Sequence, residues 1–292
     1  TDAGKSITTS ADNVYIGKGA GYGTTTSYGS NVAIGKDAFY TNTTGYSQTA
    51  VGSGALYLNT TGNQSTALGY QSLYSNTTAS NNTGIGYYAL RLNTTATGNS
   101  AVGAGALSAN TTGHSNTAMG HNAMRVNSTG DENVALGWEA LEENTTADFN
   151  TAIGKHAGQK NTTGTKNTFI GQGTSRFNTT GVENTSVGQE SSHTNTTGSK
   201  NAVLGRGAFY ANTTGSTNVA IGHDSLAQNT TASANTAVGY SALTANTTGT
   251  ENTALGYQAL TTNVTGNYNT ALGIQAMRYN TASNNTAVGT AA

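Results

Sequence analysis

The hydrophobic and polar residues of this chain recur with one fixed spacing. The string Asn-Thr-Ala-(Ile/Leu/Val)-Gly returns along the whole sequence, and its glycines are 17 residues apart except at the first step (18) and the last (16). The full repeat is N-T-A-(I/L/V)-G-x-x-A-L-x-x-N-T-T-G-x-x, with its residues numbered as positions 1 to 17. Position 4 is always apolar, position 9 is usually Leu, Phe or Met, and position 5 is glycine in all seventeen copies.

This unit predicts short parallel strands. Seventeen residues are too few for a helix-turn-helix repeat, which needs more than about 30, and no Asn-Gly or Asp-Gly hairpin signal occurs. We expect an all-β parallel β-roll or β-solenoid of about seventeen 17-residue coils. At about 4.8 Å per coil, the stack makes a rod on the order of 80 Å long. Residues 1–12 form a lead-in or partial coil, and residues 13–292 a single repeat domain.

Alternation along each strand assigns its two faces. Positions 2 and 4 point to one side and position 3 to the other, and we expect the large apolar side chain at position 4 to fill the core. Position 5 needs a positive φ or no Cβ, and glycine provides both at low cost. The predicted core residues are Ile34, Leu68, Ile85, Leu136, Ile153, Ile170, Leu204, Ile221, Leu255 and Leu272. The predicted turn residues are Gly35, Gly52, Gly69, Gly86, Gly103, Gly120, Gly137, Gly154, Gly171, Gly188, Gly205, Gly222, Gly239, Gly256 and Gly273.

The core of a single coil is thin, because only positions 4 and 9 carry large apolar side chains. Apolar burial contributes about 25 cal/mol per Å². We therefore favour an intertwined homotrimer, in which three chains around one axis bury both apolar rows. A monomeric solenoid is the alternative.

Some repeats resemble those of a known family. Asn31-Val32-Ala33-Ile34-Gly35 and Asn218-Val219-Ala220-Ile221-Gly222 resemble the N-x-A-I-G repeats of trimeric autotransporter adhesin heads (YadA-like), which form a left-handed parallel β-roll. The longer unit at residues 252–260 is similar to repeats of phage and bacterial tail-fibre-type proteins that often precede an endosialidase-type chaperone domain. The likeness covers about residues 13–289 and implies a fibrous, adhesive role. The 17-residue period departs from the usually shorter adhesin-head unit.

Composition removes several classes of function. The chain has 39 glycines, no proline and no cysteine, which excludes disulfides, thiolate metal sites and a cysteine nucleophile. Its 12 Lys+Arg and 13 Asp+Glu give a net charge of −1 without a basic run, so nucleic-acid binding has no electrostatic support. No apolar stretch approaches the roughly 20 residues that span a bilayer, and we expect no membrane insertion by this segment.

Motifs for catalysis or metal binding are not found. The five histidines form no H-x-H or H-E-x-x-H pattern. Aspartates are too few for a calcium-binding β-roll, and the carboxylates are too dispersed for a polysaccharide lyase built on a solenoid. We expect a non-enzymatic protein with no catalytic residues, no metal and no cofactor.

Two polar rows have more than one interpretation. Position 12 forms an Asn-x-(Ser/Thr) sequon in fourteen consecutive copies, from Asn42 to Asn263, which indicates either N-glycosylation or a ladder of stacked amides. We favour the ladder, because the asparagine at position 1 repeats as strongly without a regular sequon. Threonine rows at positions 13 and 14 suggest ice binding, although adjacent residues do not both point outward from one strand.

The repeat is irregular in coils 9 to 11, residues 150–200. Position 9 becomes Gly158, Ser175 and Ser192, while Phe169 and Phe177 appear close by. We favour repacking, with the phenylalanines filling the volume of the missing leucines. The alternative is a ligand patch made of Lys155, Lys160, Lys166, Arg176 and Phe177.

An intermittent aromatic stripe follows position 6. It can stack on sugars or, in the interpretation we favour, shield the neighbouring strand. Its members are Tyr70, Tyr87, Trp138, Tyr240 and Tyr257.

Together these patterns predict an extracellular, cell-surface or virion fibre segment. It would be a stiff rod for adhesion or receptor presentation, such as part of a tail fibre or surface adhesin, with a receptor or glycan as partner. The alternative is a monomeric ice-binding or carbohydrate-binding β-solenoid.

Overall fold

The chain folds into parallel strands joined by short turns. The computed structural model describes residues 2–9, 11–25 and 29–292, and these contain no helix. They divide into two units, Thr1–Thr146 (unit 1) and Ala147–Ala292 (unit 2). Unit 1 contains β1 (Val14–Ile16), β2 (Val32–Ile34), β3 (Thr49–Val51), β4 (Thr66–Leu68), β5 (Thr83–Ile85), β6 (Ser100–Val102), β7 (Thr117–Met119) and β8 (Val134–Leu136). Unit 2 contains β9 (Thr151–Ile153), β10 (Thr168–Ile170), β11 (Thr185–Val187), β12 (Ala202–Leu204), β13 (Val219–Ile221), β14 (Thr236–Val238), β15 (Thr253–Leu255), β16 (Thr270–Leu272) and β17 (Thr286–Val288).

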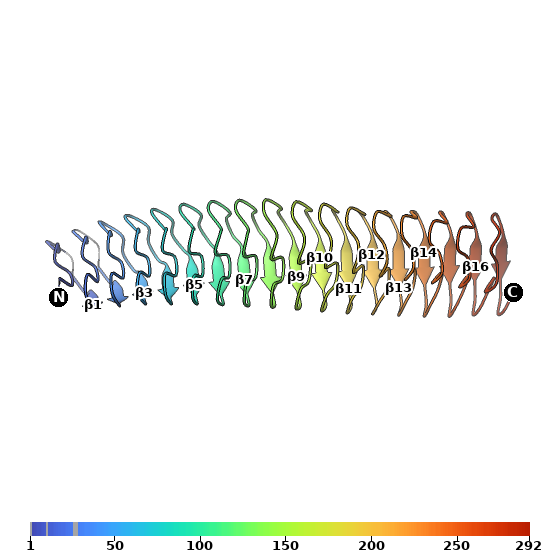
Figure 1. Cartoon of the computed structure of the whole chain (residues 1–292), viewed down its shortest axis with the longest axis horizontal. Helices are drawn as coiled ribbons and strands as arrows, with labels where there is room; N and C mark the ends of the chain where they lie inside the picture. The colour runs from blue at the N-terminus through green and yellow to red at the C-terminus, as the bar shows by residue number, and fades with distance from the viewer. Residues whose placement is uncertain (1, 10, 26–28) are drawn as a thin grey trace. The chain divides into compact units, whose positions relative to one another are not determined.

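Within each unit, every strand pairs with its equivalent one repeat later. Ala50 lies opposite Ala67 in unit 1, and Ala237 lies opposite Ala254 in unit 2, in both cases in parallel register. Figure 1 shows one strand per coil at the same place in successive coils. The predicted all-β parallel solenoid is therefore confirmed, and the described residues contain 17 strands in about 16 coils.

The glycine at position 5 ends each strand for two reasons. Gly35 has a φ of +135°, and a Cβ on it would lie 2.7 Å from the carbonyl oxygen of Gly52 in the next coil. A side chain would therefore be strained and would also collide with backbone. All fifteen predicted turn glycines have φ values between +127° and +144°, which confirms their role.

Three further positions of a typical coil also adopt positive φ, and most of them are not glycine. At positions 17, 7 and 9, Gln64, Gln71 and Leu73 have φ values of 54°, 50° and 51°. This conformation costs about 1 kcal/mol or more in a residue with a side chain. It turns successive N–H groups in opposite directions: Gln71 donates to Ser53 in the preceding coil, and Leu73 donates to Ala89 in the following coil. Hydrogen bonds between coils thus offset the local strain.

The core contains positions 3, 8 and 9, not position 4. Ala67 at position 3 is fully buried, whereas Leu68 beside it is 46% exposed. The inner space is narrow, because the leucine at position 9 fills it and leaves room only for a small residue at position 3. The predicted core assignment is therefore wrong for this chain, and none of its ten residues is buried: Ile34, Leu68, Ile85, Leu136, Ile153, Ile170, Leu204, Ile221, Leu255 and Leu272.

Two asparagine ladders line the rest of the interior. At position 12, Asn127 Nδ2 donates to Asn110 Oδ1 at 2.8 Å. At position 1, the backbone N–H of Asn116 donates to Asn99 Oδ1 at 2.9 Å. Both rows also bond the carbonyl at position 15, as Asn99 and Asn110 do to Gly113 at 2.8 and 2.9 Å. The ladder interpretation is confirmed, and the sequon amides from Asn42 to Asn263 are buried.

Candidate functional site

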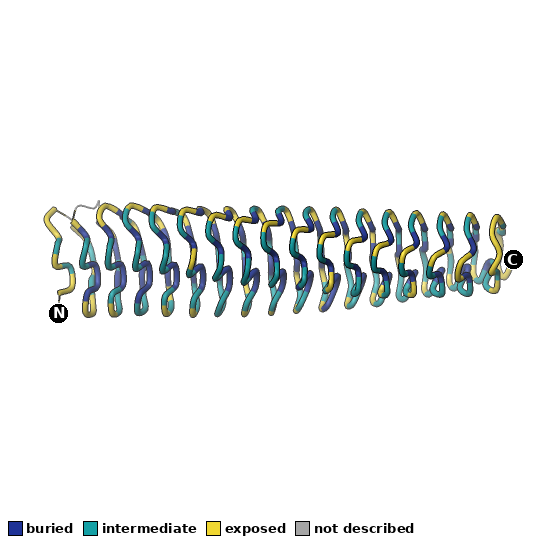
Figure 2. The backbone as a smooth tube through the Cα atoms, turned by 45° about the horizontal axis from the view of Figure 1, so that its top comes forward, coloured by how far each residue is buried: buried dark blue, intermediate teal, exposed yellow. Residues whose placement is uncertain are grey.

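The outer face of the strands is a regular, partly exposed surface of each unit. We call the residues at positions 2 and 4 the strand face. Its aliphatic row stays in contact with solvent, as shown by Leu204 and Leu255, which are 50% and 49% exposed. Figure 2 shows buried, intermediate and exposed segments recurring from coil to coil. The strand face therefore presents a row of aliphatic side chains beside a row that is mostly threonine.

The aromatic residues at position 6 stack on one another. Tyr70 and Tyr87 lie 5.6 Å apart between ring centroids, and Tyr240 and Tyr257 lie 5.4 Å apart, with interplanar angles of 14° and 13°. His223 covers the other face of Tyr240 at 5.4 Å. A ring enclosed on both sides has no face left for a sugar, so the sugar-stacking interpretation fails for Tyr240.

The structure brings together only part of the predicted ligand patch. The Arg176 guanidinium lies 5.5 Å from the ring centroid of Phe177, and the N–H of Lys160 donates to the Arg176 carbonyl at 2.9 Å. These three residues occupy positions 10 and 11 of neighbouring coils. Lys155 lies at position 6, two residues after β9, and Lys166 lies at position 17, before β10, so neither shares positions 10 and 11 with the other three.

The repacking interpretation is right for one phenylalanine and wrong for the other. Phe169 at position 3 is fully buried, whereas Phe177 is 38% exposed. Position 3 lies against positions 8 and 9 of the preceding coil, since a Cβ on Gly84 would meet the side chains of Ser72 and Leu73. By the same register Phe169 lies over Gly158, whose missing side chain leaves the space for the ring.

Titratable groups form no metal-binding cluster among the described residues. No group of three or more His, Asp or Glu side chains converges there, and the described part of the chain has no helix long and apolar enough to cross a membrane. His193 packs against Phe177 and Tyr210, with centroid distances of 5.2 and 5.0 Å. Burial lowers the pKa of His193, and this desolvation outweighs the opposing field of Glu190.

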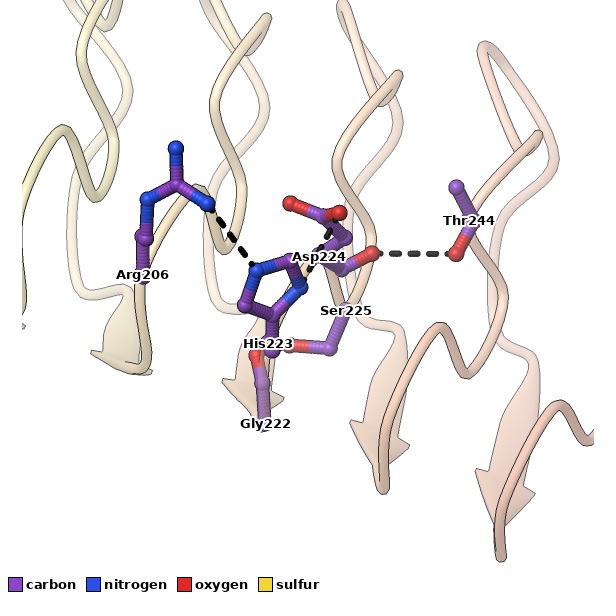
Figure 3. A network of polar contacts seen from close by, with 6 residues as sticks. All are labelled: Arg206, Gly222, His223, Asp224, Ser225 and Thr244. Atoms are coloured by element: carbon purple, nitrogen blue, oxygen red, sulfur yellow. Dashed lines mark hydrogen bonds and ion pairs between the residues drawn. The ribbon is translucent and has the colours of Figure 1, made fainter.

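One polar network was not anticipated from the sequence. Arg206 Nη1 lies 3.3 Å from His223 Nε2, and His223 Nδ1 lies 3.0 Å from Asp224 Oδ2. Thr244 Oγ1 donates to the Asp224 carbonyl at 3.0 Å (Figure 3). The repeat contains the signal for it, because Arg206 and His223 both occupy position 6 in consecutive coils and are therefore adjacent.

Comparisons with known proteins identify no relative. A scan against protein-family models finds no match, and searches of curated proteins and of solved structures find none. The likeness to adhesin-head and tail-fibre repeats thus stays a prediction from the motifs at residues 31–35, 218–222 and 252–260. The candidate surfaces are defined by the coil geometry alone.

Proposed function

We propose that this chain is a non-enzymatic segment of an extracellular, cell-surface or virion fibre, in which stacked coils form a stiff rod that presents an adhesive tip. The observation that carries the proposal is the exposed aliphatic row of the strand face. Repetition of one coil without insertions suits a spacer of constant cross-section. Backbone hydrogen bonds between successive coils suit a protease-resistant structure.

The strand face supports assembly with further copies of the same chain. Leu204 and Leu255 are about half exposed, and their neighbours along position 4 are also aliphatic. A monomeric soluble protein rarely exposes a contiguous apolar patch larger than a few hundred Å². A homotrimer around one axis would cover this row, which adds apolar burial to a core that has only one large side chain in most coils.

The mass of the purified chain in solution tests this proposal. We expect sedimentation equilibrium at micromolar concentration to give three times the chain mass. The double variant Leu204→Lys and Leu255→Lys should dissociate the assembly, because it would place charges in the apolar interface. Thr214→Lys and Thr248→Lys, at exposed position 14, form the matched control and should leave the mass unchanged. A folded wild-type monomer, shown by circular dichroism and sedimentation, would overturn the trimer.

Ice binding is a second candidate function for the same face. For this candidate we propose the threonine row at position 2 in place of the rows at positions 13 and 14. The hydroxyl at position 13 is engaged, as when Thr60 Oγ1 donates to the Thr77 carbonyl at 3.1 Å. At position 2, Thr236, Thr253 and Thr270 stand in direct register on the outer face, one coil apart.

An ice-binding surface and a trimer interface are mutually exclusive uses of the strand face. Inhibition of ice recrystallisation by monomeric wild-type chain, lost in Thr253→Lys, would support ice binding. Inactivity of the wild-type chain in this assay would exclude it. Ala202 and Val219 interrupt the threonine row, which favours assembly over ice binding.

A further inference from the structure

Rings at position 10 stack in two short runs, and the second run ends beside a small residue. In unit 1, Tyr22, Tyr40, Tyr57 and Tyr74 stack with centroid distances of 4.8, 5.2 and 5.0 Å and nearly parallel planes. In these four coils position 10 thus holds planar side chains one coil apart, and each ring covers its neighbour's face.

In unit 2 this stacking begins and then stops. His193 and Tyr210 lie 5.0 Å apart with an interplanar angle of 4°. The next two residues of the row are Ala227 and Thr244. The face of Tyr210 that is turned away from His193 therefore has no ring against it, and the layer of Ala227 lacks the ring that a tyrosine would supply.

An open cavity of about 420 Å³ lies at this vacancy. This volume falls within the roughly 300–1,000 Å³ typical of small-ligand sites. Tyr210, Ala227 and Thr244 line the cavity together with polar side chains that include Glu190, Arg206, Asp224 and Gln228. The site thus combines an aromatic face with both hydrogen-bond donors and acceptors.

The network in Figure 3 holds one of these acceptors in place. His223 Nδ1 lies 3.0 Å from the Asp224 carboxylate, and the other ring nitrogen, Nε2, lies 3.3 Å from Arg206 Nη1. Thr244 bonds the Asp224 carbonyl and so fixes the turn that carries this side chain. Asp224 therefore faces the ligand space on an anchored backbone.

We propose that this cavity binds one neutral pyranose residue of a glycan, stacked on Tyr210 in the layer of Ala227. A pyranose has an apolar C–H face that packs on an aromatic ring and a rim of hydroxyls that both donate and accept hydrogen bonds. Glu190 and Asp224 accept from these hydroxyls, and Arg206 and Gln228 donate to them. Two carboxylates against one guanidinium disfavour phosphorylated or acidic sugars. The site rests on the adhesive role proposed above, and a neutral glycan would be the ligand to which the fibre adheres.

Saturation-transfer NMR with the full chain tests the site, using the methyl glycosides of glucose, galactose, mannose and N-acetylglucosamine as probes. We expect at least one of them to bind. Ala227→Tyr should weaken that binding at least tenfold, because the new ring fills the vacant layer as tyrosines do elsewhere in this row. Tyr210→Ala should also weaken it, through loss of the stacking face.

Ser108→Tyr is the matched control, since Ser108 is another small residue at position 10 but lies in unit 1. It should leave glycoside binding unchanged, and unaltered thermal melting of Ala227→Tyr should show that the fold persists. Binding that survives Ala227→Tyr, or no binding of any of the four probes, would overturn the proposal. Adenosine is tested in the same way. Binding of adenosine together with no binding of any glycoside would overturn the assignment to a pyranose. These outcomes are independent of the mass measurement that tests the fibre.

Discussion

Two regions of unit 2 build the same coil around different interiors. In residues 201–276, Phe209, Leu226, Leu243 and Leu260 pack with alanines into one apolar cluster. In residues 150–200 the corresponding position 9 holds glycine or serine in every coil, and Phe169 is the large buried side chain. Both regions nevertheless keep the parallel register and the 17-residue period. Different buried apolar side chains can thus fill the interior of the same coil backbone.

The framework common to both regions is polar. In the serine-containing region, Asn178 Nδ2 donates to Asn161 at 2.7 Å and to the Gly181 carbonyl at 3.1 Å. Asn246, in the leucine-containing region, makes the equivalent bonds to Asn229 and Gly249 at 3.2 and 2.9 Å. The asparagine ladder is therefore the same in residues 150–200 and 201–276, whereas the apolar core differs between them.

The largest effect should come from removing Phe169, the fully buried ring of residues 150–200. Phe169→Ala deletes a fully buried side chain, and we expect a loss of about 3–5 kcal/mol in unfolding free energy. No neighbouring leucine at position 9 can collapse into the cavity, because these positions are Gly158 and Ser175. Urea denaturation followed by circular dichroism measures the change. A loss below about 1 kcal/mol would show that Phe169 is not the core of this region.

A compensating substitution sharpens that result. Gly158→Leu alone should destabilise, because the new side chain overlaps the space of Phe169. The double variant Gly158→Leu and Phe169→Ala has alanine at position 3 and leucine at position 9, the combination found in residues 201–276. Leu73 shows that leucine accepts the positive φ at this position. The double variant should recover most of the stability, and simple addition of the two losses would contradict the packing described for Phe169.

The ladder should respond equally in both regions. Asn178→Ala and Asn246→Ala each remove a buried amide that donates two hydrogen bonds and accepts one. Leaving those partners unpaired should cost about 1–3 kcal/mol in each case. We expect the two losses, measured by urea denaturation, to agree within about 0.5 kcal/mol. A much larger loss at Asn178 would mean that the ladder compensates for the missing leucines.

The sequence was sufficient to predict the period, the parallel strands, the turn glycines and the asparagine ladder. Each depends on a rule that acts within one coil or between equivalent residues of adjacent coils. The orientation of the strand could not be predicted, because alternation separates position 3 from position 4 without indicating which side is inside. Leu68 is the larger residue, yet the narrow interior selects Ala67.

The candidate sites were harder to predict, because they depend on which corners of the coil come together. Lys155 and Arg176 are 21 residues apart and occupy positions 6 and 10 of neighbouring coils. Arg206 and His223 are 17 residues apart and adjacent. The cavity beside Ala227 lies where the stacked rings end at Tyr210. A small residue in a variable position gives little signal until the stacking of its row is known.

A smaller effect should come from the serines themselves. Ser175 Oγ is buried without a hydrogen-bond partner, whereas Ser192 Oγ accepts from Ser186 at 3.0 Å. Ser175→Ala should therefore raise the unfolding free energy by about 1 kcal/mol, since it removes an unsatisfied polar group. Ser192→Ala is the control and should lower it. If both variants were destabilising, Ser175 would have a partner in solution, such as a bound water.

The smallest effect should be a dependence on pH at His193. Burial lowers its pKa in the folded chain, whereas in the unfolded chain the pKa is about 6.5. Below that value the unfolded state binds more protons than the folded state, so stability is fully present above about pH 6.5 and falls as the pH decreases toward the folded pKa. The loss should be modest, because the ring is partly exposed to solvent.

Thermal melting at pH 7.5 and 5.5 measures this dependence, with His193→Tyr as the matched variant. Tyrosine at position 10 stacks in Tyr40 and Tyr57, so the variant keeps a ring against Tyr210 without a group that titrates in this range. We expect wild type to lose more melting temperature on acidification than the variant does. Equal losses would place the acid sensitivity elsewhere, and a rise in wild-type stability at pH 5.5 would mean that the folded chain favours the charged imidazole. The variant also keeps the face of Tyr210 beside Ala227 unchanged, so glycoside binding should survive it while the pH dependence of melting becomes smaller.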